Sequence, residues 1–245
     1  MDGAVKSAAR TLGAFAFFAE RQAPATVSEV AAALDMPVSS ASILLKSLHG
    51  LGYLERPPRS REYVPALRFA LLGAWLLENL LSEAGPASQL IETLRTQTEE
   101  TAVLAAEQAP DVAYVRILES IAPVRFHLKS GIRRPLWLTA AGQAILAAWP
   151  DARIERLLAD ARDAGARPPD ADRFLAEIAR IRAAGYAITE GAATPDGAMI
   201  AVAFPSTAGP ALALAVCGPL ERMRRKEAQI VEVMARLIRE VAPGR

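Results

Sequence analysis

The chain has one cysteine, Cys217, and two histidines, His49 and His127, among its 245 residues. A single cysteine excludes an intramolecular disulfide, and no basic, apolar and small-residue signal opens the sequence. The cytoplasm is therefore the expected location. The histidines lie outside any metal-ligand spacing, so we expect no metal and no cofactor.

Catalytic motifs are also lacking. The sequence has no glycine-rich phosphate loop and no paired carboxylates spaced for acid–base catalysis. His127 and Cys217 would be the base and the nucleophile of an enzyme, but each is isolated in sequence. A lone cysteine before Gly218 and Pro219 at a strand end is far more often a small buried hydrophobic residue. We therefore do not expect an enzyme.

Neither sign of charge is in excess, because 28 Lys and Arg oppose 27 Asp and Glu. With 52% hydrophobic and 22% charged residues, the composition indicates a well-packed soluble chain of two ordinary domains. The most apolar run, residues 66–81, is too short to span a membrane and is interrupted by Arg68, Glu78 and Asn79. Only a local basic patch can therefore indicate nucleic-acid binding.

Residues 66–84 are predicted to form a linker helix that is apolar on more than one side. Leu67, Leu71 and Leu81 belong to one stripe at helical spacing, while Phe69 is among the apolar residues of the other side. Such a helix needs more than one partner. Its place between two domains favours contact with the same helix of a second subunit, which would give a homodimer. The alternative is that it packs wholly within its own chain.

Residues 1–65 are predicted to form a winged helix-turn-helix DNA-binding domain. The segment Thr26–Glu29 is a capping box, in which threonine and glutamate satisfy each other's backbone N–H groups, so a helix begins there. A proline then ends that helix. Ser39 or Ser40 is expected to cap a second helix that ends at Gly50.

This second helix has one apolar and one polar face. The apolar stripe should pack on the preceding helices and comprises Ala41, Leu44, Leu45, Leu48 and Leu51. The other face is free to enter a major groove, and residues 53–64 follow as a basic hairpin, the wing. The predicted DNA-binding residues are Ser39, Ser40, Ser42, Ile43, Lys46, Arg56, Arg59 and Arg61. The alternative is a protein-interaction module with the same elements.

Residues 85–245 are predicted to form an α+β domain with an antiparallel sheet that carries helices. Strands are expected at residues 101–107, 112–119, 124–129, 186–189, 199–204 and 211–216. Helices are expected at residues 139–149, 151–163, 171–184 and 221–241.

The segment Gly131–Gly142 is the most suggestive part of this domain. A loop with glycine and proline leads into a helix whose first turn carries only small side chains, so a ligand can approach its free N–H groups. Helix N-termini favour anions. A carboxylate at this helix start, with the body of the ligand against Trp137 and Leu128, is one interpretation. The other is that the small residues only permit close packing of helix and sheet.

Two stretches of the chain together resemble the IclR family of bacterial transcription regulators. One is the winged helix, from Val27-Ser28-Glu29-Val30-Ala31 to Gly50-Leu51-Gly52-Tyr53-Leu54-Glu55-Arg56. The other combines Gly131–Gly142 with the later helix that ends in Gly185-Tyr186. The resemblance implies a GAF-like effector-binding domain, joined by a linker helix to the DNA-binding domain. It also implies homodimers that often pair into tetramers, double-stranded operator DNA as a partner, and small organic or aromatic acids as effectors.

Some residues depart from the family's pattern. Ile43 stands where the family usually has an arginine. Where relatives place cysteine and serine toward the ligand, this chain has Met199, Ala201, Ala215 and Cys217. We therefore expect a repressor whose effector has an apolar or aromatic body and one anionic group, or a sensor that has lost tight binding. The predicted effector-binding residues are Leu128, Gly131, Trp137, Thr139, Ala140, Ala141, Gly142, Met199, Ala201, Ala215 and Cys217.

Overall fold

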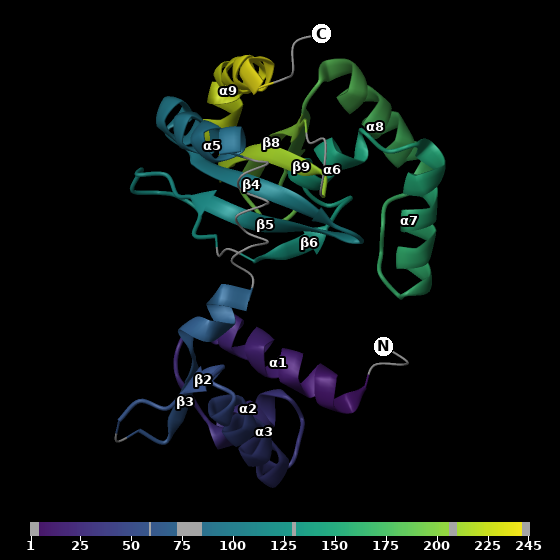
Figure 1. Ribbon diagram of the computed structural model, residues 1–245. Coiled ribbons are helices and arrows are strands. Elements are labelled where there is room, and N and C mark those ends of the chain that lie inside the picture. Colours follow the sequence, from purple (N-terminus) through teal and green to yellow (C-terminus); the bar gives the residue numbers. More distant parts are fainter. Residues whose placement is uncertain (1–4, 59, 73–84, 129–130, 206–209, 242–245) are drawn as a thin grey trace. The chain divides into compact units, whose positions relative to one another are not determined.

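The computed structural model describes residues 5–58, 60–72, 85–128, 131–205 and 210–241 of the chain. The chain divides into two compact units, Met1–Glu78 and Asn79–Arg245, whose elements are labelled in Figure 1. Residues 73–84, which hold most of the predicted linker helix, lie outside the described residues, and the proposed homodimer contact of that helix stays a prediction.

Three helices form the body of the first unit: α1 (Lys6–Arg21), α2 (Val27–Ala33) and α3 (Val38–Gly50). The predicted capping box starts α2, because the Thr26 hydroxyl accepts the N–H of Glu29 and the Glu29 carboxylate accepts the N–H of Thr26. The chain bends by 113° between α2 and α3. That bend is within the range of helix-turn-helix motifs.

Two details of α3 were predicted wrongly. The residue before the helix is Pro37, with no side-chain cap, so Ser39 and Ser40 lie in the first turn and do not cap it. Proline precedes a helix readily, because its fixed φ suits the helix start and no N–H is lost there. Leu51 is 58% exposed and is not part of the packed stripe, because it lies beyond the last helical residue.

A three-stranded antiparallel sheet completes this unit, in the order β1 (Ala25–Thr26), β3 (Glu62–Pro65), β2 (Leu54–Glu55). Strands β2 and β3 form the predicted hairpin, and β1 is an additional partner that the sequence did not indicate. Buried side chains from helices and sheet share one core, with Leu45 and Tyr63 among its members.

The helix that follows the hairpin is described over residues 67–72 and is anchored to this core. The ring of Phe69 stacks on Phe15 with centroids 4.0 Å apart. On another side, Arg68 donates from Nη1 to the carbonyl oxygen of Leu51 at 3.1 Å, and its guanidinium lies 5.1 Å from the ring centroid of Tyr53. Leucines of the same helix are exposed at Leu67, Leu71 and Leu72.

The second unit is built on a six-stranded sheet in which every pair is antiparallel, as the predicted α+β class requires. The order is β6-β5-β4-β9-β8-β7. The strands are β4 (Thr101–Gln108), β5 (Asp111–Leu118), β6 (Arg133–Pro135), β7 (Ala187–Glu190), β8 (Gly197–Phe204) and β9 (Leu212–Pro219).

The strand predicted at residues 124–129 is wrong. Residues 121–128 are irregular, and the outer edge of β5 is paired instead with β6, where Val112 lies opposite Arg134. Alternating apolar side chains misled the prediction. Phe126 and Leu128 pack against the core from a loop, while the intervening His127 bonds to Glu119 through Nδ1 at 2.8 Å.

Helices cover both faces of the sheet (Figure 1). On one face lie α5 (Gly85–Thr98) and α9 (Leu220–Val241). On the other lies α6 (Ala140–Leu146), with α7 (Asp151–Asp163) and α8 (Ala171–Ala184) beyond it. Among the described residues, no single helix is long and apolar enough to cross a membrane.

Two close interactions fix the helices on the sheet. Gly142 brings α6 so close to the preceding loop that a Cβ on this residue would lie 2.2 Å from the carbonyl oxygen of Leu136. On the opposite face, the buried carboxylate of Glu100 accepts two hydrogen bonds from Arg222 at the start of α9, at 2.5 and 2.7 Å. The first interaction depends on a missing side chain, whereas the second is a bidentate ion pair.

Candidate functional site

The outer face of α3 is the first candidate surface. Ser39, Lys46 and Ser47 are exposed, and Ile43 is 68% exposed although it is apolar. Ser47 donates from Oγ to the Ile43 carbonyl at 2.9 Å, so its hydroxyl is partly used within the helix. The predicted residues Ser40 and Ser42 are at the edges of this face, and both are half-buried.

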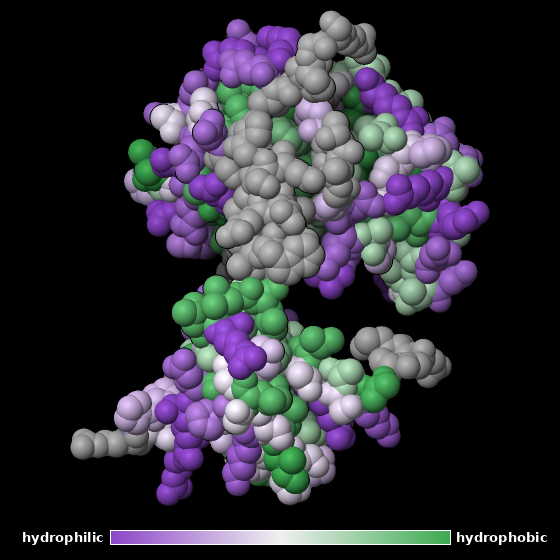
Figure 2. All heavy atoms as spheres, viewed as in Figure 1, coloured by the Kyte–Doolittle hydropathy of each residue, from purple (hydrophilic) through white to green (hydrophobic). Residues whose placement is uncertain are grey.

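The hairpin beside α3 carries the predicted arginines, and Figure 2 shows hydrophilic side chains over it. Arg61 is exposed. Arg56 is exposed as well but is held in place, because its Nε donates to the Ser60 carbonyl at 3.1 Å and its guanidinium lies 5.9 Å from the Tyr63 ring centroid. Arg59 lies outside the described residues.

These features together suit a nucleic-acid backbone and groove. Lys46 and Arg61 are cations for which no carboxylate lies within ion-pair distance in the described parts of the chain. Cations of this kind meet phosphates, while small hydroxyls and an apolar side chain on a helix contact base edges. The exposed hydroxyls and cations therefore lie on the helix and the hairpin that the sequence predicted. The hydrogen bond and the ring contact that hold Arg56 within the hairpin were not predicted.

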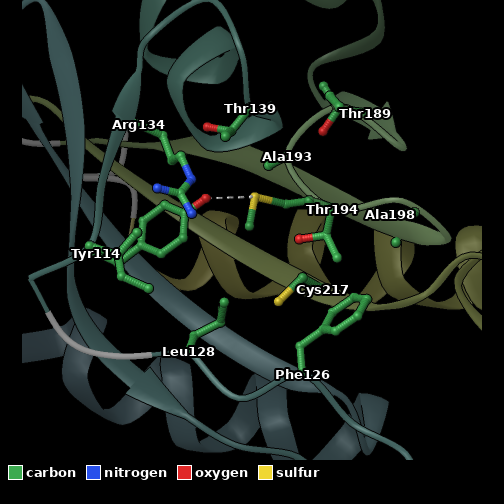
Figure 3. A pocket seen from close by; sticks show the side chains of 14 residues that line it. Tyr114, Phe126, Leu128, Arg134, Thr139, Thr189, Ala193, Thr194, Ala198 and Cys217 are labelled. Atoms are coloured by element: carbon green, nitrogen blue, oxygen red, sulfur yellow. Dashed lines mark hydrogen bonds between the residues drawn. The ribbon is translucent and has the colours of Figure 1, made fainter.

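The second candidate site is a cavity in the C-terminal unit, beside the start of α6 (Figure 3). About 50 Å³ of it can hold the centre of a water-sized sphere, within about 490 Å³ of atom-free space that includes open solvent. The described residues that line it are Tyr114, Phe126, Leu128, Ile132, Arg134, Thr139, Thr189, Ala192, Ala193, Thr194, Gly197, Ala198, Met199 and Cys217.

Four of the predicted effector-binding residues line this cavity: Leu128, Thr139, Met199 and Cys217. The others lie elsewhere. Trp137 lines a separate surface hollow together with Phe174. Gly131 is exposed in a turn with φ +85°, which glycine adopts without strain. The remaining small residues are buried in the core around the cavity and do not line it: Ala140, Ala141, Gly142, Ala201 and Ala215.

The start of α6 is capped by two threonines. Ala140 donates its N–H to Oγ1 of Thr189 at 3.2 Å, and Gly142 donates its N–H to Oγ1 of Thr139 at 3.3 Å. Two of the N–H groups that the sequence offered to an anion are therefore already bonded within the protein. Close packing explains the small residues of this turn, since Gly142 lies directly against the Leu136 backbone.

The polar groups of the cavity gather around Tyr114 and Arg134, which were not among the predicted residues. Tyr114 is buried and donates to Sδ of Met199 at 3.8 Å, a weak acceptor. Burial raises the pKa of Tyr114 to about 12, and the nearby Thr139 hydroxyl and Arg134 charge act in the opposite direction. Strand alternation could have indicated from the sequence that Tyr114 and Arg134 face the same side of the sheet. That inference requires the pairing of β5 with β6 to be known.

Cys217 lies at the apolar side of the cavity and is buried, as predicted. Burial, together with the negative charge of Glu100, raises the pKa of the Cys217 thiol to about 12. A thiol of this kind stays protonated at neutral pH and is a poor nucleophile. It acts here as a small apolar wall residue. Across the described ranges, no three side chains of the metal-binding types cluster into a possible metal site.

Comparison with known proteins identifies both units. The IclR helix-turn-helix domain family matches residues 7–58, and the bacterial transcriptional regulator IclR C-terminal family matches residues 80–242. The probable transcriptional regulator SauR of Cupriavidus necator is 31% identical over 139 residues, which cover 56% of this chain and 54% of SauR. The chain spans about half the length of the curated relatives that it matches at 30% identity or more.

Solved structures share the fold. An IclR transcriptional regulator from Alicyclobacillus acidocaldarius superposes with a TM-score of 0.71 at 21% identity, covering 95% of this chain and 98% of the other. An IclR homologue from Microbacterium hydrocarbonoxydans, solved in complex with 4-hydroxybenzoate, gives a TM-score of 0.72 at 20% identity, covering 96% of this chain and all of the other. Among the curated relatives, SauR is named a probable transcriptional regulator, and KdgR of Escherichia coli, 30% identical over 125 residues, is named a transcriptional regulator of the helix-turn-helix type.

Proposed function

Because this chain belongs to the IclR family of bacterial transcriptional regulators, we propose that it represses transcription by binding operator DNA and that a small organic acid in the cavity changes this binding. The DNA-binding residues are the exposed side chains of α3 and the wing. The effector is an acid with an aromatic or apolar body.

The observation that carries the DNA-binding proposal is the outer face of α3. It presents Lys46, serine hydroxyls and the exposed Ile43 side by side, with Arg61 of the wing available for phosphate. No base-reading arginine stands on this face. Hydroxyls, the contact of Ile43 with a thymine methyl group, and DNA shape therefore supply the sequence preference.

The effector proposal rests on the composition of the cavity wall. Phe126, Leu128 and Met199 offer an apolar surface, and hydroxyls and one cation lie among them. A relative with the same fold binds 4-hydroxybenzoate, a small aromatic acid. Pockets with an apolar wall and a few placed polar groups are typical of small-molecule sites.

Signal transfer is proposed to run through a homodimer. Two copies place two α3 helices on two half-sites, and effector binding changes how the linker helices pack and thus the spacing of the half-sites. Such coupling is typically worth about 1–3 kcal/mol and is reciprocal. Operator DNA should therefore change effector affinity by the same factor by which effector changes DNA affinity.

The test is fluorescence anisotropy of the full-length protein with its own upstream intergenic duplex and with an unrelated duplex, over a salt series. We expect a preference for the upstream duplex that falls steeply with salt. Changing Lys46 and Arg61 to alanine should weaken binding and reduce the slope of log K against log salt by about 0.9 for each phosphate that the variant no longer neutralises. Arg173→Ala, on the exposed side of α8, is the matched control.

Equal affinity for both duplexes, or an unchanged salt slope in the double variant, would contradict the DNA-binding proposal. In that case the winged helix is a protein-interaction module.

A further inference from the structure

Arg134 is the only charged residue among the described residues that line the effector cavity. The pairing of β5 with β6 explains why its side chain points inward. Arg134 lies opposite Val112, which is buried on the same face as Tyr114. Its neighbour Arg133 lies opposite Ala113 and therefore points to the other face of the sheet.

The two arginines differ in their partners. Arg133 forms an ion pair with Asp111 at 3.0 Å. For Arg134, by contrast, the described part of the chain offers no carboxylate within ion-pair distance, and its hydrogen bond is from Nη1 to the Arg133 carbonyl at 3.2 Å. A guanidinium has five N–H donors in a planar fork. Most of this donor capacity is left for a ligand.

Other donors lie at the same end of the cavity. Figure 3 shows Arg134, the Tyr114 hydroxyl and Thr139 grouped on one side, with Phe126 and Cys217 on the other. Among the described residues, the Tyr114 hydroxyl donates to the Met199 sulfur at 3.8 Å and lies near the Thr139 hydroxyl, so a carboxylate would be a stronger acceptor for it. The cavity thus has a cationic end with several donors and an uncharged end, where Thr194 lies beside Phe126 and Cys217.

We propose that Arg134 binds the carboxylate of the effector through its guanidinium fork, with the Tyr114 hydroxyl as a second donor, and thereby selects aromatic monocarboxylates over their neutral analogues. This inference rests on the proposed function. It places the anion on β6 and not at the start of α6, where Thr139 and Thr189 already occupy two of the N–H groups.

Charge complementarity supports this assignment. The wall holds one arginine and no aspartate or glutamate among its described residues, so a ligand with a single negative charge neutralises it. A charge-assisted bidentate pair is about twice as strong as a neutral hydrogen bond. The opposite end, with Phe126 and Cys217, is suited to a ring or a short hydrocarbon chain.

The test is isothermal titration calorimetry of the full-length protein with benzoate, 4-hydroxybenzoate and the neutral 4-hydroxybenzamide. Three proteins are compared: wild type, Arg134→Gln and Arg133→Gln. The last variant removes an equal charge from the same strand, but from the face that points away from the cavity. Thermal unfolding of each variant checks that it is folded, and Arg134→Lys tests whether charge without the fork restores binding.

We expect Arg134→Gln to weaken binding of the two carboxylates by about tenfold or more, with Arg134→Lys in between and Arg133→Gln within about twofold of wild type. The neutral amide should bind wild type and Arg134→Gln alike. If the acids bind wild type and a folded Arg134→Gln equally, the assignment of Arg134 is overturned while acid sensing stands. If neither acid binds wild type but the amide does, both the assignment and the proposed acid effector are overturned. Absence of binding by all three compounds likewise contradicts both.

Discussion

Strand β9 carries side chains of different size on the two faces of the six-stranded sheet. On the face covered by α5 and α9, strand β9 contributes Leu212, Leu214 and Val216. On the face covered by α6, the same strand contributes Ala213, Ala215 and Cys217. The first face is filled by large side chains that meet two helices. On the second, small side chains let α6 approach closely and leave an open volume beside its start.

The difference shows how one strand serves stability and binding at once. Alternation along a strand separates the two faces, so the volume on each face is set independently. Met199 is the largest β8 side chain on the cavity face, whereas Ile200, Val202 and Phe204 fill the other face. Both faces carry a buried core, and the open volume lies on the face that β9 lines with small side chains.

The largest expected effect is a loss of folding stability when side-chain volume is removed from the face covered by α5 and α9. Leu214 is fully buried there, and Leu214→Ala should lower the free energy of unfolding by about 2–5 kcal/mol through reduced burial and a new cavity. Urea unfolding followed by tryptophan fluorescence measures this, since Trp137 and Trp149 both lie in the unit. A loss below about 1 kcal/mol would show that this face is less tightly filled than its burial indicates.

The next largest effect is expected from adding a methyl group at Gly142, where α6 lies against the backbone of Leu136. Gly142→Ala places a Cβ 2.2 Å from the Leu136 carbonyl oxygen, so backbone must move. We expect a loss of about 1–3 kcal/mol and a larger proportional loss of effector affinity, because the displaced turn carries Thr139. Ala176→Gly, at an exposed position of α8, is a helix control that should cost about 0.5–1 kcal/mol. Equal costs for the two would contradict the steric account.

A smaller loss of folding stability is expected at high pH, where the Cys217 thiol ionises. The pKa of Cys217 is raised from 9.0 to about 12 in the folded protein, so the unfolded chain releases this proton first as pH rises. Folding stability from this group is fully present below pH 9 and is lost between about pH 9 and 12. At pH 10 the wild type should lose about 1 kcal/mol more than Cys217→Ala, relative to pH 8. Parallel pH profiles of the two proteins would refute this.

The smallest expected effect is that of Tyr114→Phe. Within the described part of the chain, the hydroxyl donates to the Met199 sulfur, a weak acceptor, so its removal should change the free energy of unfolding by less than about 1 kcal/mol. The aromatic ring and its burial are retained. A loss of several kcal/mol would indicate that the hydroxyl is part of a stronger network. Unfolding at several pH values below 9 avoids interference from ionisation.

Elements with clear end signals were predictable from sequence. The helices α7 and α8 have the predicted bounds, and α8 illustrates why: Asp170 caps its start and Gly185 ends it with φ +79°. Local chemistry decides such ends. The strand predicted at residues 124–129 is wrong because strand pairing, unlike a helix end, is not decided by local chemistry. The edge of β5 pairs instead with β6, which lies closer in sequence to α6.

The candidate site was predictable only in part, since its members come together through the sheet. Leu128, Thr139, Met199 and Cys217 were predicted from the sequence as effector-binding residues, and they line the cavity. Their contact with an effector stays a prediction. The sequence placed Arg134 in a loop. The direction of its side chain depends on its pairing with Val112 of β5, which only the structure shows. The capping of α6 by Thr189, 49 residues later in sequence than Ala140, is likewise a contact that no local pattern indicates.

The attachment of the helix that follows the wing has a mechanical consequence. Phe69 stacks on α1 and Arg68 bonds to the turn after α3, so this helix is held on two sides at once. Rotation about its own axis would have to break one attachment or carry both partners with it. A displacement of residues 67–72 would therefore be passed on to α1 and to the turn that follows α3.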